Sequence, residues 1–330
     1  MNDVFADRIN PKISLVLSRA LAALRPSLIA FLVANGTRLS GGVATPISFC
    51  NILFVGNFCA AITVALWFGF PEILEDLKKV STKTIIGLLI TGCLSALLSS
   101  LIFIGLRYTT VTNAVLLGRL GPVFFALAGT ILLGKKLNKF QWFGFTLIIV
   151  GVLGIVLKTS MFQINKGDLI IIASTVVYAT SSLIGKLILG KDSTLRLTVF
   201  SRNFISSIIF FIIASSLFGF EHFGDAFAGQ LWIIMAIYAL IIIVVAQFLW
   251  YAALNKLDSQ TVGKLTILSP VFGVTYAFLL NGERPSEIQV IAFFLTTIGV
   301  FIASLGRKPS PQKETELDKN PQMECTASAS

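Results

Sequence analysis

The segment IFIGLRYTTVTNAVLLGRLGPVFFALAGTILLGKKLNKFQWFGFTLIIVGVLGIVL at residues 102–157 recurs at 250–305 as WYAALNKLDSQTVGKLTILSPVFGVTYAFLLNGERPSEIQVIAFFLTTIGVFIASL. The copies align without a gap at an offset of 148, which places Pro122 opposite Pro270. A repeat of about fifty residues at one fixed offset is typical of a fold built from duplicated units. In an apolar chain, it predicts a membrane protein made of two related halves.

The composition also points to a membrane. Of the 330 residues, 55% are hydrophobic and 13% are charged, whereas an average soluble domain has about 25% charged residues. The mean hydropathy is +0.86. The 26 Lys+Arg exceed the 16 Asp+Glu, but the basic residues gather in short segments between apolar stretches, where they determine topology. We therefore expect contact with the lipid bilayer and no binding to nucleic acid.

Ten apolar stretches approach the length of about 20 residues that a helix needs to cross the hydrocarbon core. The first, within 17–40, is interrupted by Arg19, Arg25 and Arg38, and symmetry with the second half supports it. The expected fold is thus an all-α polytopic membrane protein with ten transmembrane helices. The other nine spans are expected near 45–69, 84–106, 110–133, 139–157, 168–188, 198–218, 231–254, 260–280 and 287–305.

The charged residues between the spans predict the orientation of the chain in the membrane. If the N-terminus is cytoplasmic, the cytoplasmic segments hold eighteen Lys and Arg residues and the outer segments hold five. Because cytoplasmic loops carry the excess of basic residues, both termini are expected inside. Five spans per half then make the second half enter from the opposite side. The repeats are therefore expected to be antiparallel, an arrangement that many alternating-access transporters use.

The expected domain organisation follows from these spans. An N-terminal cytoplasmic segment (1–16) precedes a first five-helix repeat (17–158) and a second one (159–306). The polar tail (307–330) lacks apolar periodicity and is expected to be disordered and cytoplasmic. The N-terminus shows no clean apolar stretch before a cleavage site, so we expect no cleaved signal peptide. A bacterial inner membrane is the default location, and an organelle membrane stays open.

Each copy of the repeat reads as a helix, a tight turn and a second helix. A proline is expected to kink the first helix, a glycine to end it in the left-handed conformation, and a capping box to start the second helix. These positions have a structural role in the hairpin. They are Pro122, Gly134, Asn138 and Gln141 in the first copy, and Pro270, Gly282, Ser286 and Gln289 in the second.

The two copies resemble the two EamA domains of the drug/metabolite transporter superfamily. The resemblance covers nearly the whole chain except for about twenty N-terminal residues and the tail. It implies a ten-helix membrane protein that moves small molecules, often metabolites, amino acids or their derivatives. The acidic residue that follows the hairpin glycine in this family is present as Glu283, but Lys135 replaces it in the first copy.

Three basic residues fall inside expected spans. Arg119 lies in the fourth span, Arg202 near the start of the seventh, and Lys264 in the ninth. The alignment places Lys264 three residues from Arg119, on the same face of equivalent helices. A cation inside a membrane usually faces a cavity or a partner. We expect Arg119 to contact a substrate, whereas Arg202 and Lys264 either assist it or extend to the lipid headgroups.

Aromatic and amide side chains add further candidates. Gln247, Trp250 and Tyr251 form one stripe on the eighth span, and Tyr276 lies on the ninth. Aromatic walls with a few polar groups suit a small-molecule pocket, although helix packing or an interfacial belt would use the same residues. Gln247, Trp250 and Tyr276 join Arg119, Arg202 and Lys264 as candidate substrate-binding residues.

The expected function is secondary transport of a small anionic or zwitterionic metabolite by alternating access. An exchanger of organophosphates or nucleotide sugars and an exporter of amino acids or amines are the narrower alternatives, and a non-transporting sensor or scaffold is the alternative of another class. The spans contain no catalytic constellation, and His222 with four dispersed cysteines does not suit a metal site. We expect no enzyme activity, metal or cofactor. The sequence also allows a homodimer.

Overall fold

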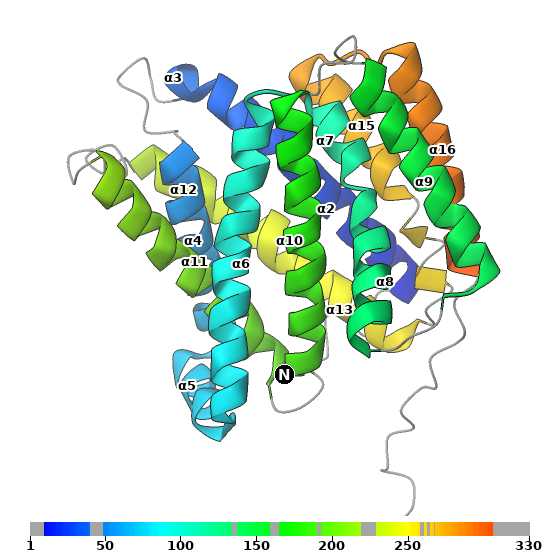
Figure 1. Cartoon of the computed structure of the whole chain (residues 1–330). Helices are drawn as coiled ribbons and strands as arrows, with labels where there is room; N and C mark the ends of the chain where they lie inside the picture. Colours follow the sequence, from blue (N-terminus) through cyan, green and yellow to red (C-terminus); the bar gives the residue numbers. More distant parts are fainter. Residues whose placement is uncertain are drawn as a thin grey trace, which may run out of the picture.

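The structure is a computed structural model that describes residues 10–39, 49–133, 137–158, 165–189, 193–218, 229–257, 261–262, 265–266 and 268–305. Within these ranges all regular structure is helical (Figure 1). Nine helical stretches of the described residues are long and apolar enough to cross a membrane, and α15 (Leu268–Asn281) is a shorter apolar helix. The protein is therefore an all-α polytopic membrane protein, as the sequence predicts. Gly134, Lys264 and the tail 307–330 lie outside the described residues.

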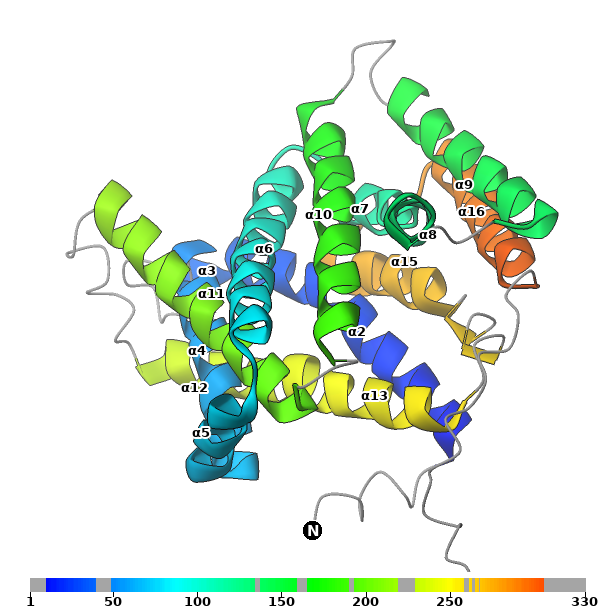
Figure 2. The same ribbon diagram turned by 60° about the horizontal axis from the view of Figure 1, so that its bottom comes forward.

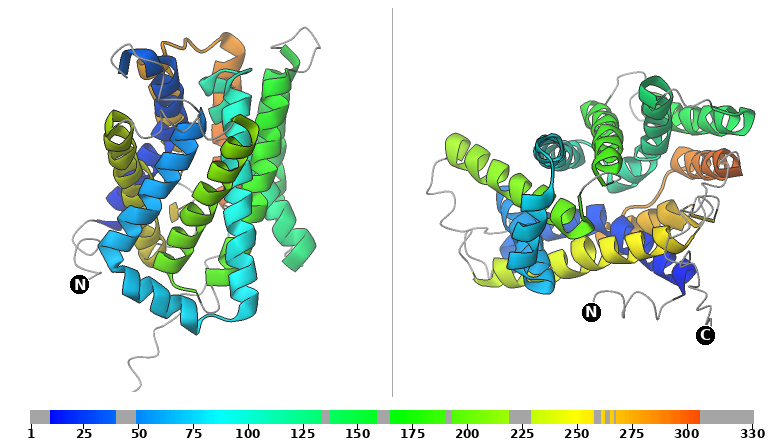
Figure 3. Two further views of the ribbon diagram at one scale, coloured as in Figure 1. Left: turned by 90° about the vertical axis from the view of Figure 1, so that its left-hand side faces the viewer. Right: turned by 90° about the horizontal axis from the view of Figure 1, so that it is seen from below.

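The first half begins with α2 (Pro11–Ala34) and the one-turn α3 (Gly36–Leu39). Its remaining helices are α4 (Phe49–Phe68), α5 (Phe70–Lys79), α6 (Thr82–Leu106), α7 (Val111–Leu117), α8 (Leu120–Leu133) and α9 (Lys139–Lys158). The short α5 crosses one end of the bundle between α4 and α6 (Figure 3). Gly69, with φ of +89°, makes the sharp turn that redirects the chain into α5.

The second half consists of α10 (Lys166–Leu189), α11 (Leu195–Phe218), α12 (Gly229–Tyr238), the π-helix η3 (Ala239–Val245), α13 (Ala246–Lys256), α15 and α16 (Glu287–Leu305). The stretch α12–η3–α13 is one continuous crossing with a π-helical middle. Such π-helical turns often occur at functional sites, and this one immediately precedes Gln247 of α13.

The first helix starts earlier than the sequence analysis expected. The Asn10 side chain accepts a hydrogen bond from the Lys12 backbone N–H at 3.0 Å, and Pro11 is the first helical residue. Asparagine before proline is a strong helix start, because the amide caps the helix and proline needs no partner. Arg19 and Arg25, which the charge count placed in the cytoplasmic flank, therefore lie on a candidate membrane-spanning helix.

The fourth crossing was expected as one helix, 110–133, with a kink at Pro122. Instead α7 ends at Leu117, α8 begins at Leu120, and Pro122 is the third residue of α8. Proline is well placed there because the first N–H groups of a helix have no intrahelical partner. The backbone N–H of Gly121 donates to Gly118 O at 3.1 Å, as Ser269 N does to Thr266 O at the aligned position.

The helices pack between the halves in a reciprocal pattern. The last helices of the two copies, α9 and α16, lie side by side (Figure 1). The first crossing, α2, packs on α13 and α15, and its counterpart α10 packs on α6 and α8. Figure 2 shows α2 running beside α13 while α10 lies beside α6. The bundle is thus held by contacts between the copies, and its interior is lined by residues of both.

The hairpin turns follow the sequence prediction where they are described. Gly282 has a φ of +66°, and the N–H of Glu283 donates to Ala277 O at 3.2 Å, which closes α15 as a glycine-terminated helix does. Asn138 and Gln141 exchange backbone and side-chain hydrogen bonds at 3.0 and 2.9 Å, a complete capping box.

Candidate substrate site

Arg119 occupies the break between α7 and α8. Its backbone N–H donates to Leu116 O at 3.0 Å, and its Nε donates to Val115 O over a long 3.4 Å. The side chain is half-buried. Because the helix is interrupted at this position, the guanidinium lies in the middle of a crossing and close to other polar backbone. Within the described residues, no carboxylate forms a salt bridge with it.

Two residues from other helices share this part of the interior. Arg119 lies within electrostatic range of Arg19 of α2 and of Tyr178 of α10. Tyr178 packs against the start of α8, since a Cβ added to Gly121 would lie 3.3 Å from its ring. The three side chains come from separate crossings that adjoin in the bundle, since α2 and α10 both pack on α7.

Arg19 is connected in turn to Trp250 of α13. The guanidinium carbon lies 3.7 Å from the centroid of the indole ring, a close cation–π contact. Ser14 and Ser18 of α2 donate to Leu249 O and Ala246 O at 3.0 and 2.7 Å, and these bonds fix α2 against α13. Trp250 therefore contacts Arg19 through its ring, and Arg19 lies within electrostatic range of Arg119.

Gln247 lies one helical turn before Trp250. Its Oε1 is buried and has no hydrogen-bond partner among the described residues. A buried amide oxygen without a partner costs about 1 to 3 kcal/mol, so a bound group that donates to it would be favoured. The position offers an unused acceptor one helical turn from Trp250, the residue that Arg19 contacts.

Three half-buried or buried carboxylates of the described bundle form hydrogen bonds away from Arg119. Asp76 of α5 accepts from Arg196 at one end of the bundle. Asp168 and Glu283 accept hydrogen bonds at the opposite end, at the starts of α10 and α7 (top of Figure 1). Among the described residues, Arg119 and Arg19 therefore add positive charge to a region without a bound carboxylate, and burial makes such charge costly unless an anion or water compensates it.

The remaining predicted site residues are not drawn into this group. Arg202 of α11 donates from Nε to Ser95 Oγ of α6 at 2.9 Å. Tyr276 of α15 stacks on Phe272, with ring centroids 6.4 Å apart. Neither has a described contact with Arg119 or Trp250. The side chain of Tyr251 lies outside the described part of the chain.

Sequence reasoning missed Arg19 and Tyr178. Arg19 was seen only as a charge that interrupts the first expected span (17–40), and it was counted among the cytoplasmic basic residues. The Asn10-Pro11 start signal and the spacing of Ser14 and Ser18 would have extended the helix through it. Tyr178 gave no comparable signal, since a tyrosine in an apolar span is also an ordinary packing residue.

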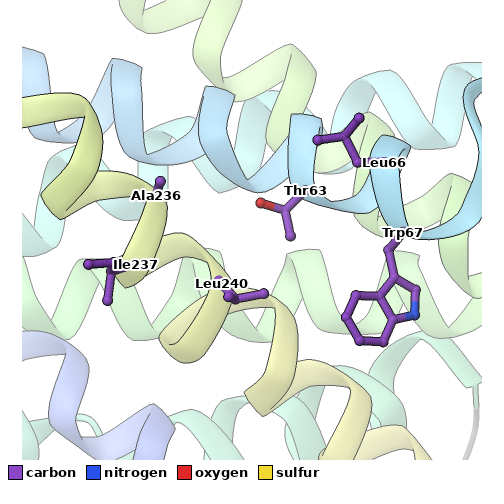
Figure 4. A pocket seen from close by; sticks show the side chains of 6 residues that line it. All are labelled: Thr63, Leu66, Trp67, Ala236, Ile237 and Leu240. Atoms are coloured by element: carbon purple, nitrogen blue, oxygen red, sulfur yellow. The ribbon is translucent and has the colours of Figure 1, made fainter. Parts of the chain in front are cut away.

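A pocket of about 370 Å³ lies away from this group, between α4 and the α12–η3 crossing (Figure 4). Five of its six lining side chains are apolar, and Leu66 is 80% exposed. The lining is completed by Thr63, Trp67, Ala236, Ile237 and Leu240. An open apolar groove on membrane-spanning helices suits contact with lipid, and it offers no charged group to a polar substrate.

Comparison with known proteins supports a transporter. A sequence profile of the EamA-like transporter family matches residues 70–157 and 165–305. An uncharacterized transporter of Synechocystis is 29% identical over 97% of this chain and 95% of that protein. The riboflavin transporter ImpX of Fusobacterium nucleatum is 25% identical over 84% of this chain and 96% of its own length.

Two further similarities agree with these. A probable amino-acid metabolite efflux pump of Salmonella typhimurium is 25% identical over 56% of this chain and 64% of that protein. A crystal structure at 18% identity covers 88% of this chain and 99% of the compared chain, with a TM-score of 0.54. The latter similarity concerns the fold alone.

Proposed function

Because the chain belongs to the EamA-like transporter family, we propose that it is a secondary transporter of a small anionic or zwitterionic metabolite. The single observation that supports this substrate class is that Arg119, in the break of a crossing, lies within electrostatic range of Arg19, whose guanidinium lies on the Trp250 ring. A carboxylate or phosphate between the two arginines would accept charge-assisted hydrogen bonds in a fixed geometry. An aromatic wall beside them would exclude water and cover the rest of the substrate.

Gln247 would allow the site to bind a zwitterionic substrate. Its buried Oε1 could accept from the ammonium group of a substrate whose carboxylate faces the arginines. Arg202, Lys264 and Tyr276 are assigned to other parts of the substrate path. Arg202 faces α6. The alignment of the copies makes Lys264 the equivalent of residue 116, three residues before Arg119.

The proposed mechanism is alternating access between two inverted repeats. The reciprocal packing of the helices supports it, because the contacts of α2 with α13 and α15 correspond to those of α10 with α6 and α8 when each crossing is exchanged for its counterpart. The break at Gly118 also recurs at Thr266. A substrate held between two such halves can be exposed to one side at a time when the halves rock.

We place the protein in a bacterial inner membrane with both termini cytoplasmic, as the distribution of basic residues indicates. Its partners would be the lipid bilayer, the substrate and, if it dimerises, a second copy of the chain. Neither nucleic acid nor a metal has a role in the proposed mechanism.

A phosphate-ester exchanger is the second candidate, since two adjacent guanidinium groups suit a dianion better than a monoanion. Export of an amino-acid metabolite is favoured instead by the acceptor on Gln247. Uptake into liposomes that are preloaded with the same compound separates them. An exchanger is stimulated by internal substrate, and an exporter is not.

The test begins by comparing metabolites in a strain that lacks the protein and one that overproduces it. The compound that differs is then measured in proteoliposomes that contain wild-type protein, Arg119→Ala, or the exposed control Arg284→Ala. Losing a charge-assisted hydrogen bond should lower kcat/KM roughly tenfold to a hundredfold in Arg119→Ala, and leave the control unchanged.

A cationic substrate, or normal uptake by correctly inserted Arg119→Ala, would contradict the assignment. Absence of any transport would favour a sensor or scaffold.

A further inference from the structure

One carboxylate of the second copy caps a helix of the first. Glu283, in the turn between α15 and α16, accepts from the backbone N–H of Val111 at 2.7 Å through Oε1. Its Oε2 accepts from the N–H and the hydroxyl of Thr112 at 2.8 and 2.7 Å. Three donors thus converge on a single half-buried side chain. Helix N-termini favour negative charge, which strengthens each of these bonds.

A second polar connection lies beside the first. Gln289 of α16 donates from Nε2 to Asn113 Oδ1 of α7 at 2.7 Å. Asn113 and Thr109 in turn donate to Asp168 Oδ1 of α10 at 3.3 and 2.5 Å. The α15–α16 turn of the second copy is thereby tied to α7, and through α7 to α10, at the upper end of Figure 1.

The capped helix leads directly to the proposed substrate site. Helix α7 has only seven residues, and Arg119 follows its C-terminal residue Leu117 after Gly118. So short a helix has little stability by itself, and tertiary contacts must fix its position. When the Glu283 contact breaks, α7 is released at the end that lies away from Arg119.

The other copy lacks the corresponding acceptor. The position aligned with Glu283 at the offset of 148 is Lys135. A lysine ammonium has donors only and cannot cap a helix N-terminus. The second copy of the hairpin therefore has a carboxylate at this position and the first copy has a lysine, so the first hairpin has no aligned carboxylate with which to form the same cap.

We propose that Glu283 is a latch that closes its end of the transport pathway by holding α7, and that the hairpin of the first copy, with Lys135 at the aligned position, supplies no carboxylate counterpart. The transporter without substrate then rests with the Glu283 end closed. The latch is a conformational part of the proposed transport cycle. Opening requires all three bonds of Glu283 to break, and binding of substrate at Arg119, at the far end of α7, is placed to bias that step.

The test uses double electron–electron resonance on the full-length protein without substrate. One spin-label pair at Tyr108 and Arg284 reports on the Glu283 end, and a second at Lys79 and Lys256 reports on the opposite end, each in a background with its four cysteines replaced. Glu283→Gln should raise the ratio of long to short Tyr108–Arg284 distances roughly tenfold, the effect of about 1.4 kcal/mol. The second pair should shift in the opposite direction.

The exposed residue Glu287, which starts α16, supplies the matched control. Glu287→Gln should reproduce both wild-type distributions. If Glu283→Gln does not fold, Thr112→Val removes one donor and should shift the distances in the same direction, by roughly threefold. Unchanged distances in a folded variant would overturn the latch. A change at the Tyr108–Arg284 pair alone would also overturn it, because local fraying of α7 would alter only that end of the bundle. These distances need no substrate, so the latch can fail while transport through Arg119 stands.

Discussion

Asp76 is the residue through which α5 of the first copy is fixed to α11 of the second. Its carboxylate is 6% exposed and accepts from Arg196 Nε and Nη2 at 2.5 and 2.9 Å and from the Thr194 hydroxyl at 2.5 Å. The Arg196 hydrogen bond holds the pKa of Asp76 below its ordinary value. Asp76→Asn should therefore lower the free energy of unfolding in detergent at pH 7 by about 2 kcal/mol.

The pH dependence of this stabilisation has a defined sign. The folded protein binds the Asp76 proton more weakly than the unfolded chain, whose carboxyl titrates near pH 4. The contribution is complete above that pH and is lost as the pH falls through the lower, folded pKa. Melting curves should thus separate wild type from Asp76→Asn at pH 7 and converge in strong acid. Glu75→Gln, which removes an exposed pair with Lys79 on the same helix, should behave as wild type; equal losses in both variants would refute the role of Asp76.

Trp250 tests the aromatic wall of the site. Trp250→Leu removes the ring face under Arg19, and a partly desolvated cation–π contact contributes about 1 to 2 kcal/mol. We expect KM in the proteoliposome assay to rise roughly fivefold to thirtyfold, and Trp250→Phe to restore most of the loss. Trp67→Leu changes a tryptophan of the apolar groove and should leave KM unchanged. A larger effect at Trp67 would move the site to that groove.

At the scale of helices, α9 and α16 approach closely because glycines face each other. A Cβ added at Gly144 would overlap Gly299 O and lie 2.6 Å from Ala303 N. Backbone atoms cannot rotate away, so Gly144→Ala should cost about 1 to 3 kcal/mol in thermal unfolding. Gly129→Ala in α8 is the matched control, since no atom lies within 4 Å of its added Cβ. Similar melting temperatures for the two variants would show that this helix pair can separate without cost.

Sequence alone predicted most crossings to within a few residues, because the length and apolarity of a span are local properties. It failed where local signals competed. Pro122 was the visible break, but the helix is interrupted at Gly118, where a glycine and a charged residue follow a short capped helix. Arg19 lowered the apparent hydropathy of the first span, although tertiary hydrogen bonds from Ser14 and Ser18 keep that segment helical.

At the scale of the whole molecule, the candidate site depends on contacts that no span shows by itself. Arg119 was predicted as a substrate-binding residue because a charge within an apolar stretch can be recognised from a single sequence. Its neighbours Arg19 and Tyr178 come from crossings far away in the chain. Which crossings contact each other is determined by the packing of the two copies, and this packing is a property of the tertiary structure. The duplication predicted two halves, while the partner of each helix could be found only in the structure.

The orientation of the bundle gives the last prediction. With Arg19 and Arg25 assigned to α2, the cytoplasmic segments retain sixteen basic residues against five outside, so the inferred direction survives the correction. The α5 helix and the turn between α15 and α16 lie at opposite ends of the bundle (Figure 3). Lys79 is the last residue of α5, and Arg284 lies in that turn. In intact cells, a membrane-impermeant thiol reagent should label Arg284→Cys and label Lys79→Cys only after permeabilisation, in a background without native cysteines. The reverse pattern would invert the topology and place the Glu283 latch on the cytoplasmic side.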